Sequence, residues 1–488
     1  MPLTIAQKRL TLLAAIMGSF VALLDSTVVN VALPAIRDDL GGGLAGQQWV
    51  VNSYLLLLGS LILIGGSLGD VYGEKRVFAV GVVGFGVASI VCAAAPTIEA
   101  LVAGRALQGV FGALLTPASL AIIVAAFSGH ERGAAIGAWT AYSAGAMIVG
   151  PLVGGWIVDT FDWRWVFAIN VPFVALTLAL TARMPALQQM GAKRTPDWTG
   201  AALCGVGLAG PTFGLIQQPE HGWGSPGVVV PIVAGFAVFA AFVWWERRAR
   251  DPMLPLGLFG RGNFAWGNVE TLALYGGLGV TFFLLVLYLQ QVAGFDAFEA
   301  GLATLPTTIV TFLLSQRFGA LADRYGPRLF MGVGPLVCAA GVLLLLAMVG
   351  EQPSLIADVV PGVVVFAVGL SMTTAPLTAA ILADADEANA GIASGVNNAV
   401  ARVASLLATA GIGTVIGGTL DLDGFRMGLL FAASLTAAGG FIGLALVSDP
   451  PRDVRAEDCP GGQLAGQPRA AWEDASSGSG RPAAEPAV

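Results

Sequence analysis

The sequence predicts an all-α integral membrane protein that crosses the bilayer with fourteen helices, and two observations support this prediction. First, 56% of the 488 residues are hydrophobic and 11% are charged, whereas a soluble domain carries about 25% charged residues. No soluble core could bury so much apolar surface, so lipid must cover part of it. Second, long apolar runs follow one another along the chain, and two short segments between such runs repeat each other.

The apolar runs are long enough to cross a bilayer, which takes about 20 residues of helix. In chain order, the expected spans are 10–34, 47–68, 77–96, 99–127, 133–158, 165–185, 198–217, 226–246, 264–291, 298–320, 329–349, 355–382, 389–417 and 424–447. Basic residues gather in alternate loops, starting before the first span, so we expect both chain termini in the cytoplasm. Abundant Ala, Gly and Arg with few Lys favour a bacterial source, hence a bacterial inner membrane.

The repeated segments read GSLGDVYGEKRVF from Gly66 and GALADRYGPRLFM from Gly319. The first follows the second expected helix and the other follows the tenth, so both lie at the same membrane face. Two parallel halves of six helices are therefore expected, with two additional helices between them, a 6+2+6 layout. The expected domains are a cytoplasmic N-terminus (1–9), an N-terminal six-helix bundle (10–190), a two-helix insertion (191–250), a C-terminal six-helix bundle (251–448) and a disordered cytoplasmic tail (449–488).

Five motifs resemble those of the major facilitator superfamily, specifically its fourteen-helix drug:proton antiporter branch. They are the loop motif GxLxDxxGxK/R (Gly66 to Lys75), LDSTVVNVALP (Leu24 to Pro34), RALQG (Arg105 to Gly109), GAMIVGPLVGG (Gly145 to Gly155) and WRWVFAINVP (Trp163 to Pro172). The resemblance covers nearly all of residues 10–448 and implies the major facilitator architecture. The sequence departs from the family loop motif at Val71 and Glu74, where the family often has arginine.

Asp25 is the clearest carboxylate within an expected span. From a helix start near Leu10 it lies about 22 Å along the helix, beyond the midplane. An ionised carboxylate there costs about 2.5–3.5 kcal/mol on insertion scales. This acid could load and release a proton as its access to water changes, and Asn30 extends its polar face. A structural acid near the outer boundary is the alternative.

Arg105 also lies within an expected span, with Gln108 on the same helical face. A permanent charge in this position needs a carboxylate or carbonyl partner, and Asp25 is one candidate. A proton on Asp25 would weaken such a pair, which would link protonation to conformation. A static ion pair that orders the bundle is the alternative.

Two sets of residues are expected to serve conformational change. Gly145, Gly150, Pro151, Gly154 and Gly155 form the antiporter motif, for which we expect a tightly packed, flexible seam between the halves. Generic packing of small residues is the alternative. Asp70, Gly73 and Lys75 in one repeat, and Asp323 and Gly326 in the other, are expected to form turns that latch the cytoplasmic side. Solvated loop charges are the alternative.

Six residues are candidates for the wall of a substrate cavity, namely Asn30, Gln108, Trp139, Tyr142, Glu270 and Asn398. Glu270 could bind a cation or relay a proton, or else meet cytoplasmic water near the end of its helix. Asn398 shares a polar face with Arg402, which we expect to be a structural ion-pair partner, with a ligand-binding role as the alternative. Trp139 and Tyr142 could stack on an aromatic compound or could face lipid or core.

The resemblance implies proton-coupled, secondary-active efflux of small lipophilic or cationic drugs or antibiotics. Proton-coupled uptake of a small solute, and an intramembrane enzyme or receptor, stay open as alternatives. The sequence holds no GxxxxGK[ST] loop, no HExxH motif and no paired cysteines. We therefore expect no enzyme activity, catalytic residues, cofactor, metal or nucleic-acid partner. The expected partners are the lipid bilayer, protons and a small-molecule substrate, with the monomer as the functional unit.

Overall fold

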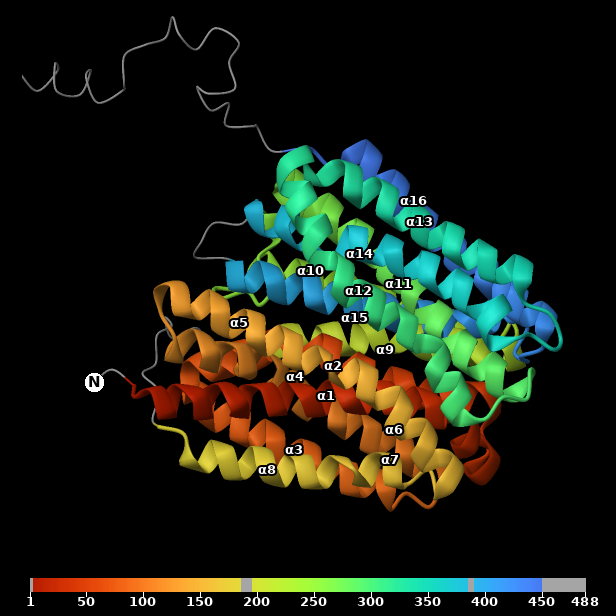
Figure 1. Cartoon of the computed structure of the whole chain (residues 1–488), viewed down its shortest axis with the longest axis horizontal. Coiled ribbons are helices and arrows are strands. Elements are labelled where there is room, and N and C mark those ends of the chain that lie inside the picture. The colour runs from red at the N-terminus through yellow and green to blue at the C-terminus, as the bar shows by residue number, and fades with distance from the viewer. Residues whose placement is uncertain (1–2, 186–194, 385–389, 450–488) are drawn as a thin grey trace, which may run out of the picture. The chain divides into compact units, whose positions relative to one another are not determined.

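The structure is a computed structural model that describes residues 3–185, 195–384 and 390–449. These residues form a bundle of long helices and contain no strand (Figure 1). The domain boundary expected at residue 190 and all but the first residue of the expected tail lie outside the described residues.

Fourteen helices of the described chain are long and apolar enough to cross a membrane, which confirms the predicted number. In chain order the elements are α1 (Ile5–Leu40), α2 (Gly43–Tyr72), α3 (Glu74–Ala93), α4 (Ile98–Ala126), α5 (Gly129–Ala144), α6 (Ala146–Thr160), α7 (Trp165–Ala168), α8 (Asn170–Arg183), α9 (Trp198–His221), α10 (Pro226–Glu246), η1 (Leu256–Gly260), α11 (Gly262–Gln291), α12 (Ala297–Tyr325), α13 (Pro327–Met348), η2 (Leu355–Val359), α14 (Val360–Ala383), α15 (Ala390–Ile416) and α16 (Leu422–Leu446). Three spans contain two elements each, namely α5 with α6, α7 with α8 and η2 with α14. The largest difference from expectation is α1, which runs from Ile5 to Leu40 where the sequence predicted 10–34. The helix continues at both ends beyond the apolar run that served for the prediction.

The repeated sequence motif forms the same turn twice. Gly73 lies between α2 and α3, and Gly326 lies between α12 and α13, with φ of 91° and 94°. Glycine adopts this left-handed region without steric cost. Each glycine N–H also closes the preceding helix, by donating to the carbonyl of Gly69 at 2.9 Å and of Ala322 at 2.8 Å. The sequence repeat is therefore also a structural repeat.

Helices of the N-terminal part of the sequence (α1–α8) meet helices of the C-terminal part (α11–α16) along four main pairs, namely α1 with α11, α1 with α12, α2 with α15 and α6 with α12. At the α2–α15 contact, Thr409 Oγ1 donates to Asn52 Oδ1 at 2.6 Å, and Gln48 Nε2 donates to the Thr409 carbonyl at 2.6 Å. At the α1–α11 contact, Gln290 Nε2 donates to the Val31 carbonyl at 3.0 Å. Hydrogen bonds from side chains to side-chain and backbone oxygens thus join the two parts.

Asp159, in the last turn of α6, joins α6 to the start of α12. Its carboxylate accepts hydrogen bonds from the backbone N–H of Ala297 at 3.0 Å and of Phe298 at 2.8 Å. These are the first two residues of α12, whose amides have no partner within their own helix. Asp159 therefore caps a helix of the other part of the sequence.

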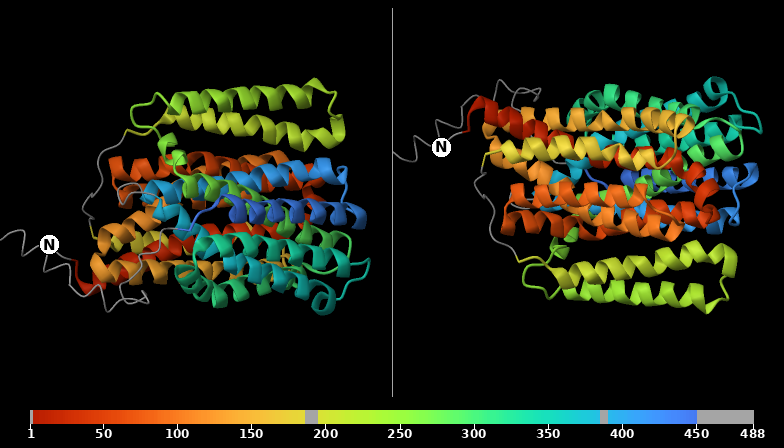
Figure 2. Two further views of the ribbon diagram at one scale, coloured as in Figure 1. Left: turned by 90° about the horizontal axis from the view of Figure 1, so that it is seen from above. Right: turned by 90° about the horizontal axis from the view of Figure 1, so that it is seen from below.

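The helices α9 and α10 form a hairpin at one side of the bundle, yellow-green in both views of Figure 2. α10 packs against α9, and α9 contacts both α2 and α15. Leu208 of α9 belongs to one hydrophobic cluster with Leu56 of α2 and Leu406 of α15. The hairpin therefore packs against helices of both parts.

Candidate functional site

Asp25 is fully buried in α1 and faces side chains from two other helices. Its Oδ2 lies 2.5 Å from Nη1 of Arg105 on α4. Its Oδ1 accepts hydrogen bonds from Gln108 on α4 at 3.0 Å and from Asn170 on α8 at 2.8 Å. The side-chain exposure is 0% for Asp25 and 2% for Arg105. The structure thus pairs the two intramembrane charges for which the sequence suggested a contact.

Gln108 and Ser89 extend this polar network. Gln108 Oε1 accepts a hydrogen bond from Arg105 Nη1 at 2.7 Å, and its Nε2 donates to Ser89 Oγ on α3 at 2.9 Å. Asn170 donates to the same hydroxyl at 3.3 Å. Buried charges persist when they are paired and hydrogen-bonded in this way. Removing one partner of a buried pair typically costs about 3–5 kcal/mol.

Asn170 and Ser89 were not selected from the sequence. Asn170 belongs to the string WRWVFAINVP, but a single sequence does not show which face of α8 turns toward α1. The available signal was a polar amide within an apolar span. That signal identifies a buried polar position without identifying its partner.

Arg105 connects the buried network with α2 and with a central cavity. Its Nε donates to the carbonyl of Val50 at 3.2 Å. Its Cζ lies 4.4 Å from the centroid of the Tyr54 ring, a cation–π contact. Arg105 also belongs to the cavity wall. A change in the Asp25–Arg105 pair would therefore alter the position or the charge of the cavity wall.

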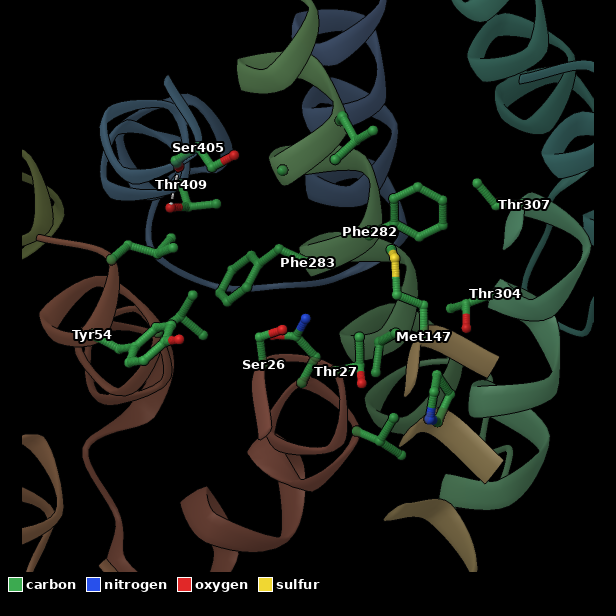
Figure 3. Close-up of a pocket in the computed structure, with 18 of the residues that line it drawn as sticks. Ser26, Thr27, Tyr54, Met147, Phe282, Phe283, Thr304, Thr307, Ser405 and Thr409 are labelled. Atoms are coloured by element: carbon green, nitrogen blue, oxygen red, sulfur yellow. Dashed lines mark hydrogen bonds between the residues drawn. The ribbon is translucent and has the colours of Figure 1, made fainter. Parts of the chain in front are cut away.

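The cavity has a volume of about 270 Å³ and lies between helices of both parts of the sequence (Figure 3). Its wall combines hydroxyl-bearing, apolar and aromatic side chains with two arginines. The lining residues are Ser26, Thr27, Asn30, Val31, Val51, Tyr54, Leu55, Arg105, Met147, Pro151, Leu278, Gly279, Phe282, Phe283, Val286, Thr304, Thr307, Thr308, Leu370, Arg402, Ser405 and Thr409. Polar groups set into a mainly apolar wall are typical of small-molecule sites.

Of the six residues proposed for the cavity wall, Asn30 lies in it and five lie elsewhere in the described structure. Gln108 belongs to the buried network. Trp139 Nε1 donates to Ser19 Oγ at 2.9 Å, on the side of α1 that packs in the interior. Tyr142 is 68% exposed. The last two, Glu270 and Asn398, lie on α11 and α15, which contribute to the cavity wall, but are not themselves part of it.

Glu270, on α11, is fully buried, so the alternative in which it meets water near the end of its helix does not hold. Neither carboxyl oxygen has a hydrogen-bond partner among the described residues. Asn398 Oδ1 accepts a hydrogen bond from Arg402 Nε at 3.4 Å. The expected ion pair of Arg402 does not occur among the described residues, and Arg402 lines the cavity instead.

The glycines of the GAMIVGPLVGG motif separate α5 from α6 and allow α6 to pack closely against α1. Gly145 separates α5 from α6. A Cβ built on Gly150 would collide with Thr27 of α1, and one on Gly154 would lie 3.0 Å from Val28 Cγ1. α6 can therefore approach α1 only because these positions have no side chain.

The same motif faces α12 through its last glycine. A Cβ on Gly155 would lie 2.5 Å from Phe298 Cα, and one on Gly301 of α12 would lie 2.5 Å from the Pro151 carbonyl oxygen. Real Cβ atoms do not approach so closely, so both glycines are required for this contact. Pro151 itself belongs to the cavity wall.

The acidic residues of the two repeated turns occupy matching places. Asp70 lies in the last turn of α2, and Asp323 in the last turn of α12. Lys75, at the start of α3, donates from Nζ to the Met184 carbonyl at 2.5 Å. This bond ties the first repeated turn to the end of α8.

In the described chain, fourteen helices are long enough to cross a membrane, eight helices line a cavity, and a buried ion pair lies at its edge. This arrangement is that of an all-helical membrane transporter. The chain belongs to the major facilitator superfamily: the family model described as "Major Facilitator Superfamily" matches residues 15–409.

Three relatives of known name are bacterial antibiotic transporters or resistance proteins. The chain is 36% identical over 426 residues to the probable actinorhodin transporter of Streptomyces coelicolor, covering 85% of this chain and 73% of the relative. It is 35% identical over 405 residues to a puromycin resistance protein of Streptomyces alboniger, covering 82% and 80%. It is 35% identical over 415 residues to the tetracenomycin C resistance and export protein of Streptomyces glaucescens, covering 83% and 75%.

Solved transporter structures share the fold at low sequence identity. A crystal structure of a D-xylose–proton symporter matches with a TM-score of 0.64 at 14% identity, covering 90% of this chain and 97% of that chain. A transporter of the POT family, crystallised with a thioalcohol-conjugated peptide, matches with a TM-score of 0.68 at 12% identity, covering 88% and 94%. These likenesses support the fold alone.

Proposed function

We propose that this chain exports small-molecule antibiotics or drugs across the cytoplasmic membrane and that proton entry drives the export. The observation that supports it best is the double role of Arg105. This side chain pairs with the buried Asp25 and also forms part of the cavity wall. The named relatives, which are antibiotic resistance and export proteins, favour this class of substrate.

Protonation of Asp25 would remove the negative charge that holds Arg105. The guanidinium would then depend on Val50, Tyr54 and Gln108 for its remaining contacts. Because Val50 and Tyr54 belong to α2, loss of the ion pair would loosen α2 against α1 and α4. A membrane potential of 100 mV supplies about 2.3 kcal/mol for each charge that moves across. Such an energy is of the order of the cost of disrupting a buried pair.

The expected orientation and the two expected bundles also suggest how the protein moves during transport. Two six-helix bundles (10–190 and 251–448) would rock against each other, with both termini in the cytoplasm and residues 191–250 inserted between them. The close α6–α12 contact at Asp159 and Gly155 would then seal the outer end of the cavity. The turns at Asp70 and Asp323 would latch the cytoplasmic end in the alternate state. The working unit is proposed to be a monomer without cofactor or enzymatic step.

Inverted membrane vesicles test this proposal directly. With an acidified lumen, an exporter accumulates substrate inside the vesicle, whereas a proton-driven importer does not. We expect accumulation with the unsubstituted chain and its loss in Asp25→Asn, with the variant still present in the membrane. Asp162→Asn is the matched control, since Asp162 is exposed and contacts Arg164. Unchanged accumulation in Asp25→Asn would remove Asp25 from the mechanism, and movement in the opposite direction would favour uptake.

A further inference from the structure

The charge of the cavity wall is positive on the side chains alone. Arg105 and Arg402 contribute guanidinium groups, and no aspartate or glutamate is among the described residues of the wall. The two arginines differ in how their charges are compensated, and that difference determines which ligand the cavity favours.

The charge of Arg105 is already compensated. Asp25 lies 2.5 Å away, and the Tyr54 ring covers the guanidinium at 4.4 Å. At 2% exposure, Arg105 offers little free donor capacity to a ligand.

The charge of Arg402 is not compensated by any carboxylate among the described residues. Its Nε donates to the neutral amide oxygen of Asn398 at 3.4 Å, a long hydrogen bond. The guanidinium has five N–H donors in a planar fork, so most of its donors remain available in the cavity. A carboxylate or phenolate is the group that such a fork binds most strongly.

The rest of the wall suits the body of an organic anion. Phe282, Phe283 and Tyr54 provide aromatic surface, and Ser26 and Ser405 provide hydroxyls around the same space (Figure 3). The cavity volume of about 270 Å³ lies just below the range of about 300–1,000 Å³ that is usual for ligand pockets.

We propose that the cavity selects compounds that carry an anionic group, a carboxylate or an ionised phenol, and that Arg402 binds this group. The aromatic or apolar part of the compound packs against Tyr54, Phe282 and Phe283. This selectivity differs from the lipophilic or cationic compounds that the sequence suggested. It rests on the proposed export function for the statement that the bound compound is transported.

Two dyes with the same ring system and opposite charges test the selectivity. Fluorescein is an anion at pH 8, and rhodamine 123 is a cation with the same xanthene core. Binding of each to the purified, full-length protein in lipid nanodiscs is measured by fluorescence anisotropy without a proton gradient. We expect the protein to bind fluorescein at least tenfold more tightly than rhodamine 123.

Variants of Arg402 and its neighbour assign the preference to one charge. Arg402→Gln should weaken fluorescein binding by about 10-fold to 100-fold, the range for a hydrogen bond to a charged group. Arg402→Lys should restore part of the affinity. Asn398→Asp keeps the arginine and places a carboxylate of the same shape beside it, so it should weaken fluorescein binding and strengthen rhodamine 123 binding. Arg426→Gln, on α16 and half exposed, is the control and should change neither.

Equal or weaker binding of fluorescein by the unsubstituted protein would overturn the proposal. Unchanged fluorescein binding in both Arg402→Gln and Asn398→Asp would do so as well, and two variants guard against a folding defect in one. Failure of the export proposal gives a different result. A protein that prefers fluorescein in nanodiscs but accumulates nothing in inverted vesicles would refute export and leave the charge preference standing.

Discussion

Replacing Asp159 tests whether the contact between α6 and α12 keeps one end of the cavity closed. Asp159→Ala removes the two hydrogen bonds from the N–H groups of Ala297 and Phe298. Loss of a helix-capping oxygen costs about 0.5–2 kcal/mol. Two such bonds are lost here, which raises the cost, but Asp159 is exposed and screening keeps the total within this range. We therefore expect the closed state to lose about 1–2 kcal/mol relative to the open state, which changes their ratio by about 5-fold to 30-fold.

A cysteine in the cavity reports this change. Asn30→Cys introduces a thiol into the cavity wall, and a membrane-impermeant maleimide added to intact cells reaches it only through the outer end. The three cysteines of the described residues, Cys92, Cys204 and Cys338, are buried. Cys459 lies outside the described residues and is replaced by Ser for this assay. If the open state is rare and limits the reaction, the labelling rate should rise by up to the same 5-fold to 30-fold in Asp159→Ala.

Asp162→Ala provides the matched control. Asp162 is an exposed acid three residues further along the chain, but it contacts Arg164 rather than α12. Its removal should leave the labelling rate unchanged. An unchanged rate in Asp159→Ala, or an equal rise in Asp162→Ala, would refute the role assigned to the α6–α12 contact.

Three other substitutions have defined outcomes. Asn170→Ala removes one donor from the buried carboxylate and should cost about 1–3 kcal/mol, seen as a lower thermal unfolding midpoint in detergent; an unchanged midpoint would contradict the network. Gly301→Leu should abolish export with the protein still in the membrane, because its Cβ has no room beside α6, whereas Gly133→Leu should not, because nothing lies within 4 Å of that position. Glu270→Gln replaces a buried group whose oxygens lack described partners, so the unfolding midpoint should stay the same or rise, and a marked fall would show a hidden partner.

The sequence was sufficient to predict the number of spans and most helix limits, because apolar length alone defines a membrane helix. It also suggested the contact between Asp25 and Arg105, since two buried opposite charges in one bundle need each other. It did not show which face of each helix turns inward. The spans are apolar on all sides, so Trp139, Tyr142 and Asn398 could not be separated from cavity residues by periodicity.

The sequence could not predict the charge of the cavity wall either, because it does not show which helix faces turn inward. Arg402 looked like half of an ion pair because buried arginines usually have an acidic partner. Whether a carboxylate lies beside Arg402 depends on the side chains of the seven other helices that line the cavity, and no local sequence pattern records them. Asn170 is the opposite case, because the sequence indicated no partner for it. The packing of α8 against α1 places its amide against the Asp25 carboxylate.

The position of the α9–α10 hairpin restricts how the two parts can move. Because α9 contacts α2 and α15 at once, a rotation that separates these two helices must detach α9 from one of them or carry it along. The described connection after α10, residues 247–255, would then have to change its span as the helices move. Shortening this connection should accordingly slow the transport cycle without altering the affinity of the cavity for its ligand.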